Sequence, residues 1–156
     1  MTIGYIAEAY NKLHKEEQLS KLRIILNELN LKEEDRVLDL GCGTGFSLDY
    51  YECKAIGVEP DKELIKQSKH NIIKASAEKI PFEDKEFTHT IVLSSFHHFK
   101  REAINEIKRV TKEKAVITIV KGLSNYKELI KTIKDNFKVI KQIEESKDSI
   151  LFVSIQ

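Results

Sequence analysis

The most informative stretch of the chain reads Val37-Leu38-Asp39-Leu40-Gly41-Cys42-Gly43-Thr44-Gly45. Its first half continues a run from Arg36 in which apolar and charged residues alternate, as in a β-strand. Three glycines spaced two residues apart then end the strand, because neither a strand nor a helix tolerates that pattern well in its interior. Without a Cβ at Gly41, Gly43 and Gly45, a ligand can lie against the backbone, where N–H groups open the next helix. The stretch therefore predicts a ligand-binding loop between a strand and a helix.

The glycine spacing discriminates between classes of ligand. A dinucleotide fingerprint has the form G-x-G-x-x-G and places a pyrophosphate over the helix N-terminus. Here the third glycine comes one residue too early, and Asp39 precedes the first glycine by two residues. A carboxylate at this place repels a phosphate but attracts an ammonium group, directly or through water. We therefore expect a nucleoside that carries an amino acid rather than a dinucleotide.

The same nine residues resemble motif I of the class I S-adenosylmethionine-dependent methyltransferases, whose common form is close to V-L-D-L-G-C-G-T-G. The resemblance implies an α/β fold with a Rossmann-like, seven-stranded methyltransferase sheet. This sheet would be mostly parallel, would close with an antiparallel hairpin and would lie between helices in three layers. Asp39 and the glycine loop would bind the methionine end of S-adenosylmethionine, and S-adenosylhomocysteine would be the product. Because the resemblance covers the whole chain in order, we expect one domain over residues 1–156.

A second acidic residue stands where a ribose would be bound. Residues 54–59 predict a strand that ends at Glu59, which lies 18 residues after Gly41 and near the expected spacing of about 20. One carboxylate can accept hydrogen bonds from both hydroxyls of a cis-diol. The resemblance assigns this role to the matching acid of the family, and we place the following Pro60 in the adenine wall.

Residues 72–82 predict a third strand and a loop that contacts the adenine. They resemble the family segment G-D-A-E-x-L-P-F, in which the Asp bonds the adenine amino group and the next backbone N–H reaches the ring. Ser76 replaces that Asp here, and Ala77 follows it. A hydroxyl still accepts a hydrogen bond, but it is shorter and neutral. We therefore expect an adenine contact that is weaker or mediated by water.

Two adjacent histidines are the sharpest candidates for catalysis. Residues 87–95 predict a fourth strand, whose end places Ser94 at the methionine end of the cofactor and His97 and His98 beside the substrate. The family pattern F-D-x-V-x-S-x-x-x-L-H-H differs here, with Thr88 for Asp and a shorter link. A histidine near its ordinary pKa of about 6.5 can accept a proton from an attacking acceptor. Many methyltransferases need no base, so capping or packing of the next helix is the alternative.

The N-terminal residues predict one or two helices. Apolar residues recur at helical spacing between Leu19 and Leu29, so a helix over about residues 15–29 would bury one face. The preceding piece carries two tyrosines, and related methyltransferases often use an N-terminal helix with a tyrosine as a lid over the cofactor. Tyr10 is the better candidate in such a lid, which would span about residues 1–30. The alternative is a surface helix with two half-buried tyrosines.

The other expected elements follow from periodicity and capping. Residues 112–114 are all charged and predict a turn. Helices are expected at 46–52, 62–70, 101–110 and 125–136, a central strand at 115–120, and a closing pair of strands at 137–143 and 149–155.

Composition indicates a soluble protein. Of 156 residues, 41% are hydrophobic and 33% charged, and no apolar run approaches the ~20 residues of a membrane span. The N-terminus lacks the continuous apolar core of a signal peptide, so we expect a cytoplasmic protein. Two cysteines without C-x-x-C spacing suggest neither a disulfide framework nor a zinc site. Residues 100–156 carry a net charge of +5; solvated helix faces explain these lysines, and nucleic-acid contact is the alternative.

The sequence therefore predicts an S-adenosylmethionine-dependent methyltransferase that acts by direct displacement at the methyl carbon. The acceptor is open between a small molecule and a macromolecule, because no Asn-Pro-Pro-Tyr signature follows the fourth strand. The main rival is a methyltransferase-fold binding or scaffold subunit without turnover. It is favoured by the loss of acids at Ser76 and Thr88 and by the small size of the chain, and disfavoured by Asp39, the glycines and Glu59. A nicotinamide-dependent oxidoreductase is the third alternative, against which the glycine spacing argues.

Overall fold

The computed structural model describes the backbone of residues 3–155 and the side chains of Ala9 and residues 12–155. The chain separates into two compact units, Met1–Asn30 and Leu31–Gln156, and each is described by itself. The first unit is helix α1 (Ile3–Leu29). It ends at Asn30, whose positive φ of 48° and N–H bond to the Leu26 carbonyl form a left-handed C-terminal cap.

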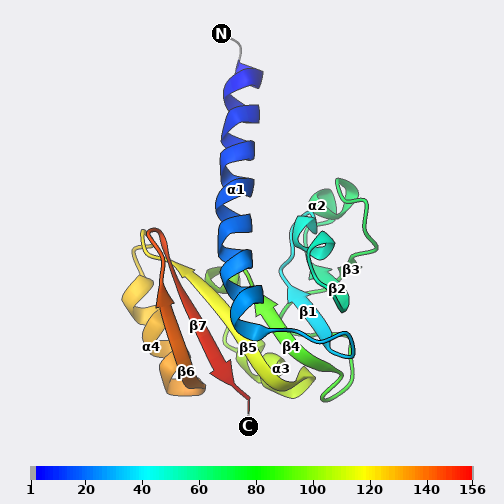
Figure 1. Cartoon of the computed structure of the whole chain (residues 1–156), viewed down its shortest axis with the longest axis vertical. Coiled ribbons are helices and arrows are strands. Elements are labelled where there is room, and N and C mark those ends of the chain that lie inside the picture. The colour runs from blue at the N-terminus through cyan, green and yellow to red at the C-terminus, as the bar shows by residue number, and fades with distance from the viewer. Residues whose placement is uncertain (1–2, 156) are drawn as a thin grey trace. The chain divides into compact units, whose positions relative to one another are not determined.

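The second unit is built on one sheet of seven strands in the order β3-β2-β1-β4-β5-β7-β6. Strands β1 to β5 pair in parallel, and β7 pairs antiparallel with both β5 and β6, so its arrow in Figure 1 points against those of β1 and β4. The expected Rossmann-like methyltransferase sheet with its closing antiparallel hairpin is confirmed. The strands are β1 (Arg36–Leu40), β2 (Lys54–Glu59), β3 (Ile73–Lys74), β4 (Phe87–Val92), β5 (Thr111–Val120), β6 (Lys138–Glu144) and β7 (Asp148–Ser154).

The strand order reverses direction between β1 and β4. The chain runs outward from β1 through β2 to β3, returns to the middle at β4, and continues to the other side through β5. In open α/β sheets of this kind, ligands bind beside the carboxyl ends of the strands at such a switch point. The end of β1, where the glycine loop begins, therefore lies at the expected binding edge (Figure 1).

Helices α3 and α4 share the hydrophobic core with the sheet. The α-helices of this unit are α2 (Lys62–Lys66), α3 (Glu102–Val110) and α4 (Tyr126–Asn136), and short 3-10 helices occupy η1 (Phe46–Asp49) and η2 (Phe96–His98). The side chains that α3 contributes to the core recur at helical spacing, as the sequence predicts. They are Ala103, Ile104, Ile107 and Val110, and they pack with strand residues that include Leu38, Leu40, Phe87 and Ile117.

The structure differs from the sequence prediction at several elements. The helix expected at 46–52 is the 3-10 helix η1, and the strand expected at 87–95 ends at Val92. Helix α2 ends at Lys66 instead of His70, and β3 has two residues because it pairs with β2 only over Val58 and Glu59. The turn predicted for residues 112–114 is wrong, since these residues continue β5. Phe87 pairs with Thr111 and His89 with Lys114, so β5 carries one extra residue there, a β-bulge.

Candidate functional site

The glycine loop follows β1 and is held to the end of β2 by backbone hydrogen bonds. Gly41 N and Cys42 N both donate to the Val58 carbonyl, over 2.8 and 3.1 Å. Gly41, Gly43 and Gly45 have positive φ values of 74°, 60° and 77°, a conformation that only glycine adopts without strain. The loop then enters η1, so the strand, loop and helical turn follow one another in the expected order, and the contact of its N–H groups with a ligand stays a prediction.

The three glycines answer different steric needs. A Cβ at Gly41 would lie 2.5 Å from Ser95 Oγ, and one at Gly45 would lie 3.0 Å from Ile72 Cδ1. These two positions make room for the protein's own side chains. At Gly43, by contrast, no described atom lies within 4 Å of the Cβ position. Gly43 is therefore the glycine against which a ligand can lie.

Asp39 is buried beneath this loop, with 1% of its surface exposed. Its Oδ2 accepts hydrogen bonds from Ser47 Oγ, which follows the loop in η1, and from Tyr51 Oη at 2.9 Å. Burial raises the pKa of this carboxyl to about 6, although the two hydroxyl donors act to lower it. Both bonds end on the same oxygen, which leaves Oδ1 able to accept from an ammonium group.

Glu59 connects the glycine loop to the end of β2. Its Oε1 accepts from Gly43 N at 2.9 Å and its Oε2 accepts from Asp61 N at 2.9 Å. The side chain is 7% exposed. A carboxylate has about four lone-pair directions, so two remain for hydroxyl donors. Asp61 in turn caps α2 by accepting from Glu63 N at 2.9 Å, which fixes the chain just past Glu59.

Cys42 is a buried packing residue and not a reactive thiol. Its side chain is buried over Gly57 of β2, where a Cβ would lie 2.7 Å from the sulfur. Burial raises the pKa of the thiol well above its usual range, and the nearby Asp39 and Glu59 carboxylates raise it further. Cys42 is therefore a neutral packing group that seats the loop on β2.

The residues expected around the adenine lie in and beside the loop after β3. Ser76 is half-buried and its carbonyl accepts from Lys79 N at 3.2 Å in a turn, while Ala77 is buried and Pro60 is exposed. Arg109 of α3 holds the following residues in place, because its guanidinium donates to the Ile80 and Phe82 carbonyls at 2.9 and 2.7 Å. The loop that would contact adenine is thus anchored on α3.

Ser94 follows β4 in a strained conformation, with a φ of 57°. Its N–H donates to Thr118 Oγ1 of β5 at 2.8 Å, and its hydroxyl donates to Asp148 Oδ2 at 3.5 Å. The neighbouring Ser95 donates to the Leu40 carbonyl at 3.1 Å and so joins the ends of β1 and β4. Ser94 therefore sits at the same sheet edge as the glycine loop.

His97 and His98 lie in η2, directly after this serine pair. Their ring centroids are 3.9 Å apart. Burial lowers the pKa of His97, and the neighbouring His98 lowers it further. His97 is half-buried and His98 is exposed, and the lowered pKa keeps the His97 ring neutral at neutral pH. Tyr10 belongs to α1, but its side chain lies outside the described residues, so the lid stays a prediction.

Residues 38–119, more than half of the chain, match the family model described as Methyltransferase domain. The chain belongs to this methyltransferase family. An uncharacterized protein of Methanocaldococcus jannaschii is 32% identical to this methyltransferase domain over 144 residues, which are 87% of the chain and 57% of that protein. The domain thus spans 57% of the length of this curated relative.

Solved structures with the same fold confirm the architecture of the methyltransferase domain. A S-adenosylmethionine-dependent methyltransferase from Aquifex aeolicus has a TM-score of 0.75 and 21% identity, covering 86% of this chain and 89% of that one. A chain from the complex between the Haloferax volcanii Trm112 methyltransferase activator and a methyltransferase has a TM-score of 0.75 and 15% identity, covering 97% and 95%. The cyclase SpnF also matches, with a TM-score of 0.73 and 14% identity over 86% and 79%. At these identities the likeness concerns the fold.

Sequence reasoning missed four residues of this site. Ser47 and Tyr51 bond Asp39, Ser95 joins β1 to β4, and Asp148 starts β7 beside Ser94. Ser47 and Tyr51 follow the motif and are four residues apart, which is helical spacing. A buried acid next to the loop could have pointed to them as its hydrogen-bond partners. Asp148 comes from the other end of the chain and carries no such signal.

Proposed function

We propose that this domain binds S-adenosylmethionine at the glycine loop and transfers its methyl group to a nucleophilic acceptor. The observation that carries the proposal is the Glu59 carboxylate, which holds Gly43 N and Asp61 N and keeps lone pairs for two hydroxyl donors. It stands beside the one loop glycine whose Cβ direction is open. This combination suits a ribose laid across the ends of β1 and β2.

The residues present fit the cofactor along its whole length. Asp39 has an oxygen for the ammonium group, Gly43 allows close approach, Glu59 suits the ribose hydroxyls, and Ser76 with Ala77 N suits the adenine edge. When bound, the cofactor would supply an electrophilic methyl group on a sulfonium, and the electron pair of the broken carbon–sulfur bond would remain on sulfur. Asp39 and Glu59, both buried, would hold the two ends of the cofactor and so fix where its methyl group lies.

His97 is the proposed acceptor of the proton that a hydroxyl or amine nucleophile loses. Its lowered pKa keeps the ring neutral at neutral pH, and its place after Ser94 puts it at the binding edge of the sheet. An acceptor that carries no acidic proton would need no such base, and His97 and His98 would then only line the acceptor site.

The rival proposal is a binding or scaffold subunit without turnover. The structure weakens the support that this rival draws from Thr88. Thr88, which replaces a family Asp, lies at the start of β4, where its hydroxyl accepts from Arg36 N and donates to the Arg36 carbonyl at 2.9 and 3.0 Å. This is the end of the strand away from the glycine loop. The replacement therefore concerns strand pairing, and the departures that remain near the cofactor site are Ser76 and the shorter link between Ser94 and the histidine pair.

Calorimetric titration with S-adenosylhomocysteine tests the cofactor, with NAD as the control. We expect micromolar binding of the first and none of the second. Transfer of a radiolabelled methyl group into cell extract then tests turnover. Extract also supplies any partner, which matters because the similar Haloferax volcanii chain belongs to a complex with a methyltransferase activator. Binding with no label incorporated from several extracts would favour the scaffold, and no binding would refute the proposal of methyl transfer by this domain.

A further inference from the structure

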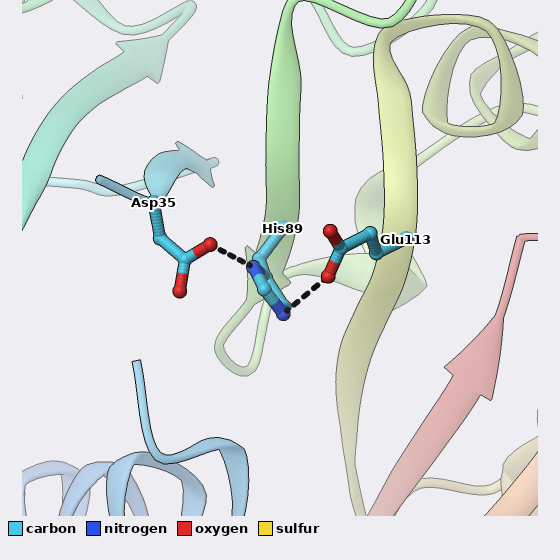
Figure 2. Close-up of side chains that lie close together, drawn as sticks. All are labelled: Asp35, His89 and Glu113. Atoms are coloured by element: carbon cyan, nitrogen blue, oxygen red, sulfur yellow. Dashed lines mark ion pairs between the residues drawn. The ribbon is translucent and has the colours of Figure 1, made fainter. Parts of the chain in front are cut away.

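Three ionisable side chains lie close together in the folded sheet (Figure 2). They lie near the amino ends of three strands, whereas the glycine loop follows the carboxyl end of β1. Asp35 immediately precedes β1, His89 is the third residue of β4, and Glu113 is the third residue of β5. Asp35 Oδ1 lies 4.0 Å from His89 Nδ1, and Glu113 Oε2 lies 3.8 Å from His89 Nε2. One ligand atom from each residue lies within 4.8 Å of the others. These residues come together only in the folded sheet.

The hydrogen bonds of Thr88 fix where the His89 ring carries its proton. Thr88 Oγ1 accepts from Arg36 N and gives its own hydrogen to the Arg36 carbonyl. It also lies 2.9 Å from His89 Nδ1, so only the ring nitrogen can be the donor in that contact. In the neutral ring the lone pair is then on Nε2, which faces Glu113. A histidine held at Nδ1 in this way presents Nε2 as a metal ligand.

His89 Nε2 makes no direct hydrogen bond to the carboxylate that faces it. The side chain is 6% exposed, and the 3.8 Å contact with Glu113 is too long for a hydrogen bond. A ring lone pair and a carboxylate oxygen repel each other unless a cation lies between them.

The β-bulge in β5 is what brings Glu113 to this place. The extra residue between the Phe87↔Thr111 and His89↔Lys114 pairs turns the strand, and bulges commonly redirect a side chain in this way. Glu113 is 47% exposed and can rotate, whereas Asp35 is 14% exposed and its Oδ2 accepts from Lys32 N at 2.8 Å. The cluster therefore joins one adjustable carboxylate to two fixed groups.

We propose that Asp35, His89 and Glu113 form a site for a divalent transition-metal ion such as Zn²⁺. His89 Nε2 and a Glu113 oxygen are the direct protein ligands, and the Asp35 carboxylate, which lies on the Nδ1 side of the ring, adds negative charge beside them. Zinc accepts imidazole and carboxylate ligands at about 2.0–2.2 Å, a contraction that rotation of Glu113 supplies. Two carboxylates balance the charge of the ion. The bound ion would tie the amino ends of β1, β4 and β5 together, far from the chemistry of the opposite edge.

Titration with Zn²⁺, and with Co²⁺ for its visible absorption, tests the site on the full chain. We expect one equivalent to bind, to raise the thermal midpoint, and to bind at least tenfold more weakly to Glu113→Gln and His89→Gln. The matched control is Glu128→Gln, an exposed acid on α4, which should bind as the unchanged protein does. The affinity for S-adenosylhomocysteine should not change with Zn²⁺.

Two results would overturn the proposal. One is a protein that binds no Zn²⁺, which would mean that His89 binds protons only and that the three residues hold no metal ion. The other is unchanged Zn²⁺ affinity in Glu113→Gln, which would move binding to another group such as the His97 and His98 pair. Since Glu113 is half-exposed, its variant should fold even if His89→Gln does not, and circular dichroism checks both.

Discussion

Glu59 acts on the protein as well as on its proposed ligand. Each of its oxygens accepts a backbone N–H, one from the glycine loop and one from the residue that caps α2. Without the carboxylate, the two N–H groups would lose this partner, and hydrogen bonds to a charged group contribute about 1.5–3 kcal/mol each. The same side chain therefore shapes the loop and, under the proposed function, would bind the ribose.

Glu59→Ala should weaken S-adenosylhomocysteine binding by roughly 1.5–3 kcal/mol, the scale of hydrogen bonds to a charged group. Calorimetry measures the dissociation constant, and urea unfolding of the apo protein measures the accompanying loss of stability. The control Glu63→Ala removes an exposed acid of α2 whose ion pair with Lys66 is solvated. A dissociation constant that does not change in Glu59→Ala would mean that the ribose is bound elsewhere.

Asp39 should make the stability of the apo protein fall as the pH rises. Its pKa is raised from 3.8 to about 6, so the folded state binds the proton more tightly than the unfolded state does. Relative to Asp39→Asn, the wild-type protein should therefore lose up to about 3 kcal/mol between pH 4 and pH 7, at 1.36 kcal/mol for each pKa unit. Urea unfolding of both proteins across this range measures the difference. A constant difference would place the titration of Asp39 outside it.

Asp39 and Glu59 were predictable because each stands at a fixed distance in sequence from the glycines. The partners Ser47, Tyr51 and Ser95 were not, because their contacts depend on how η1 and η2 return to the sheet. The sequence also assigned all three glycines to the ligand. In the structure Gly41 and Gly45 accommodate Ser95 and Ile72, which no local pattern reveals.

At the scale of the elements, the glycine loop packs against strand β2 at Gly57. A Cβ there would lie 2.7 Å from Cys42 Sγ and 3.1 Å from Leu48 Cδ1. The small residue in the strand and the cysteine in the loop are complementary in size. Strand β2 therefore positions the loop by contact as well as by the hydrogen bonds from Gly41 and Cys42 to Val58.

Gly57→Ala should displace Cys42, destabilise the protein by about 1–3 kcal/mol as overpacking does, and weaken S-adenosylhomocysteine binding. The double variant Gly57→Ala with Cys42→Ala should recover part of both losses, since it removes the sulfur that collides. Gly122→Ala is the matched control, because a Cβ there has no described atom within 4 Å. Thermal unfolding and calorimetry give the two readouts. Equal losses in the single and double variants would contradict this packing.

Elements with strong alternation were predicted to the residue, as at Arg36–Leu40 and Lys54–Glu59. Those that depend on a neighbour were not. Charged residues 112–114 extend β5 because their neighbours supply pairing partners. Strand β4 pairs with Thr111 and Lys114, and the Ile155 N–H, just after β7, donates to the Glu113 carbonyl. Strand β3 is short because β2 offers it only two pairs. The proposed metal site could not be predicted from the sequence for the same reason, because its residues come together only through the register of three strands.

For the whole molecule, ligand binding and folding should be linked through the glycine loop. S-adenosylhomocysteine at 100 times its dissociation constant should stabilise the protein by about 2.7 kcal/mol. For a chain of this size that corresponds to a rise of roughly 5–10 °C in the thermal midpoint. Thermal unfolding with and without the ligand measures it, and NAD at the same concentration should have no effect. An unchanged midpoint at saturating ligand would contradict binding to the folded state.

The order of the seven strands has a further consequence, for solubility. An open sheet ends in two edges, here β3 and β6, and an unpaired edge can template pairing with another copy of the chain. One edge is two residues long. The other has Lys138 and Lys141 on either side of the exposed Ile140, and its pairing with β7 shifts register there. A second copy docking on β6 would bring like charges together on an irregular strand, which protects the protein against fibril growth.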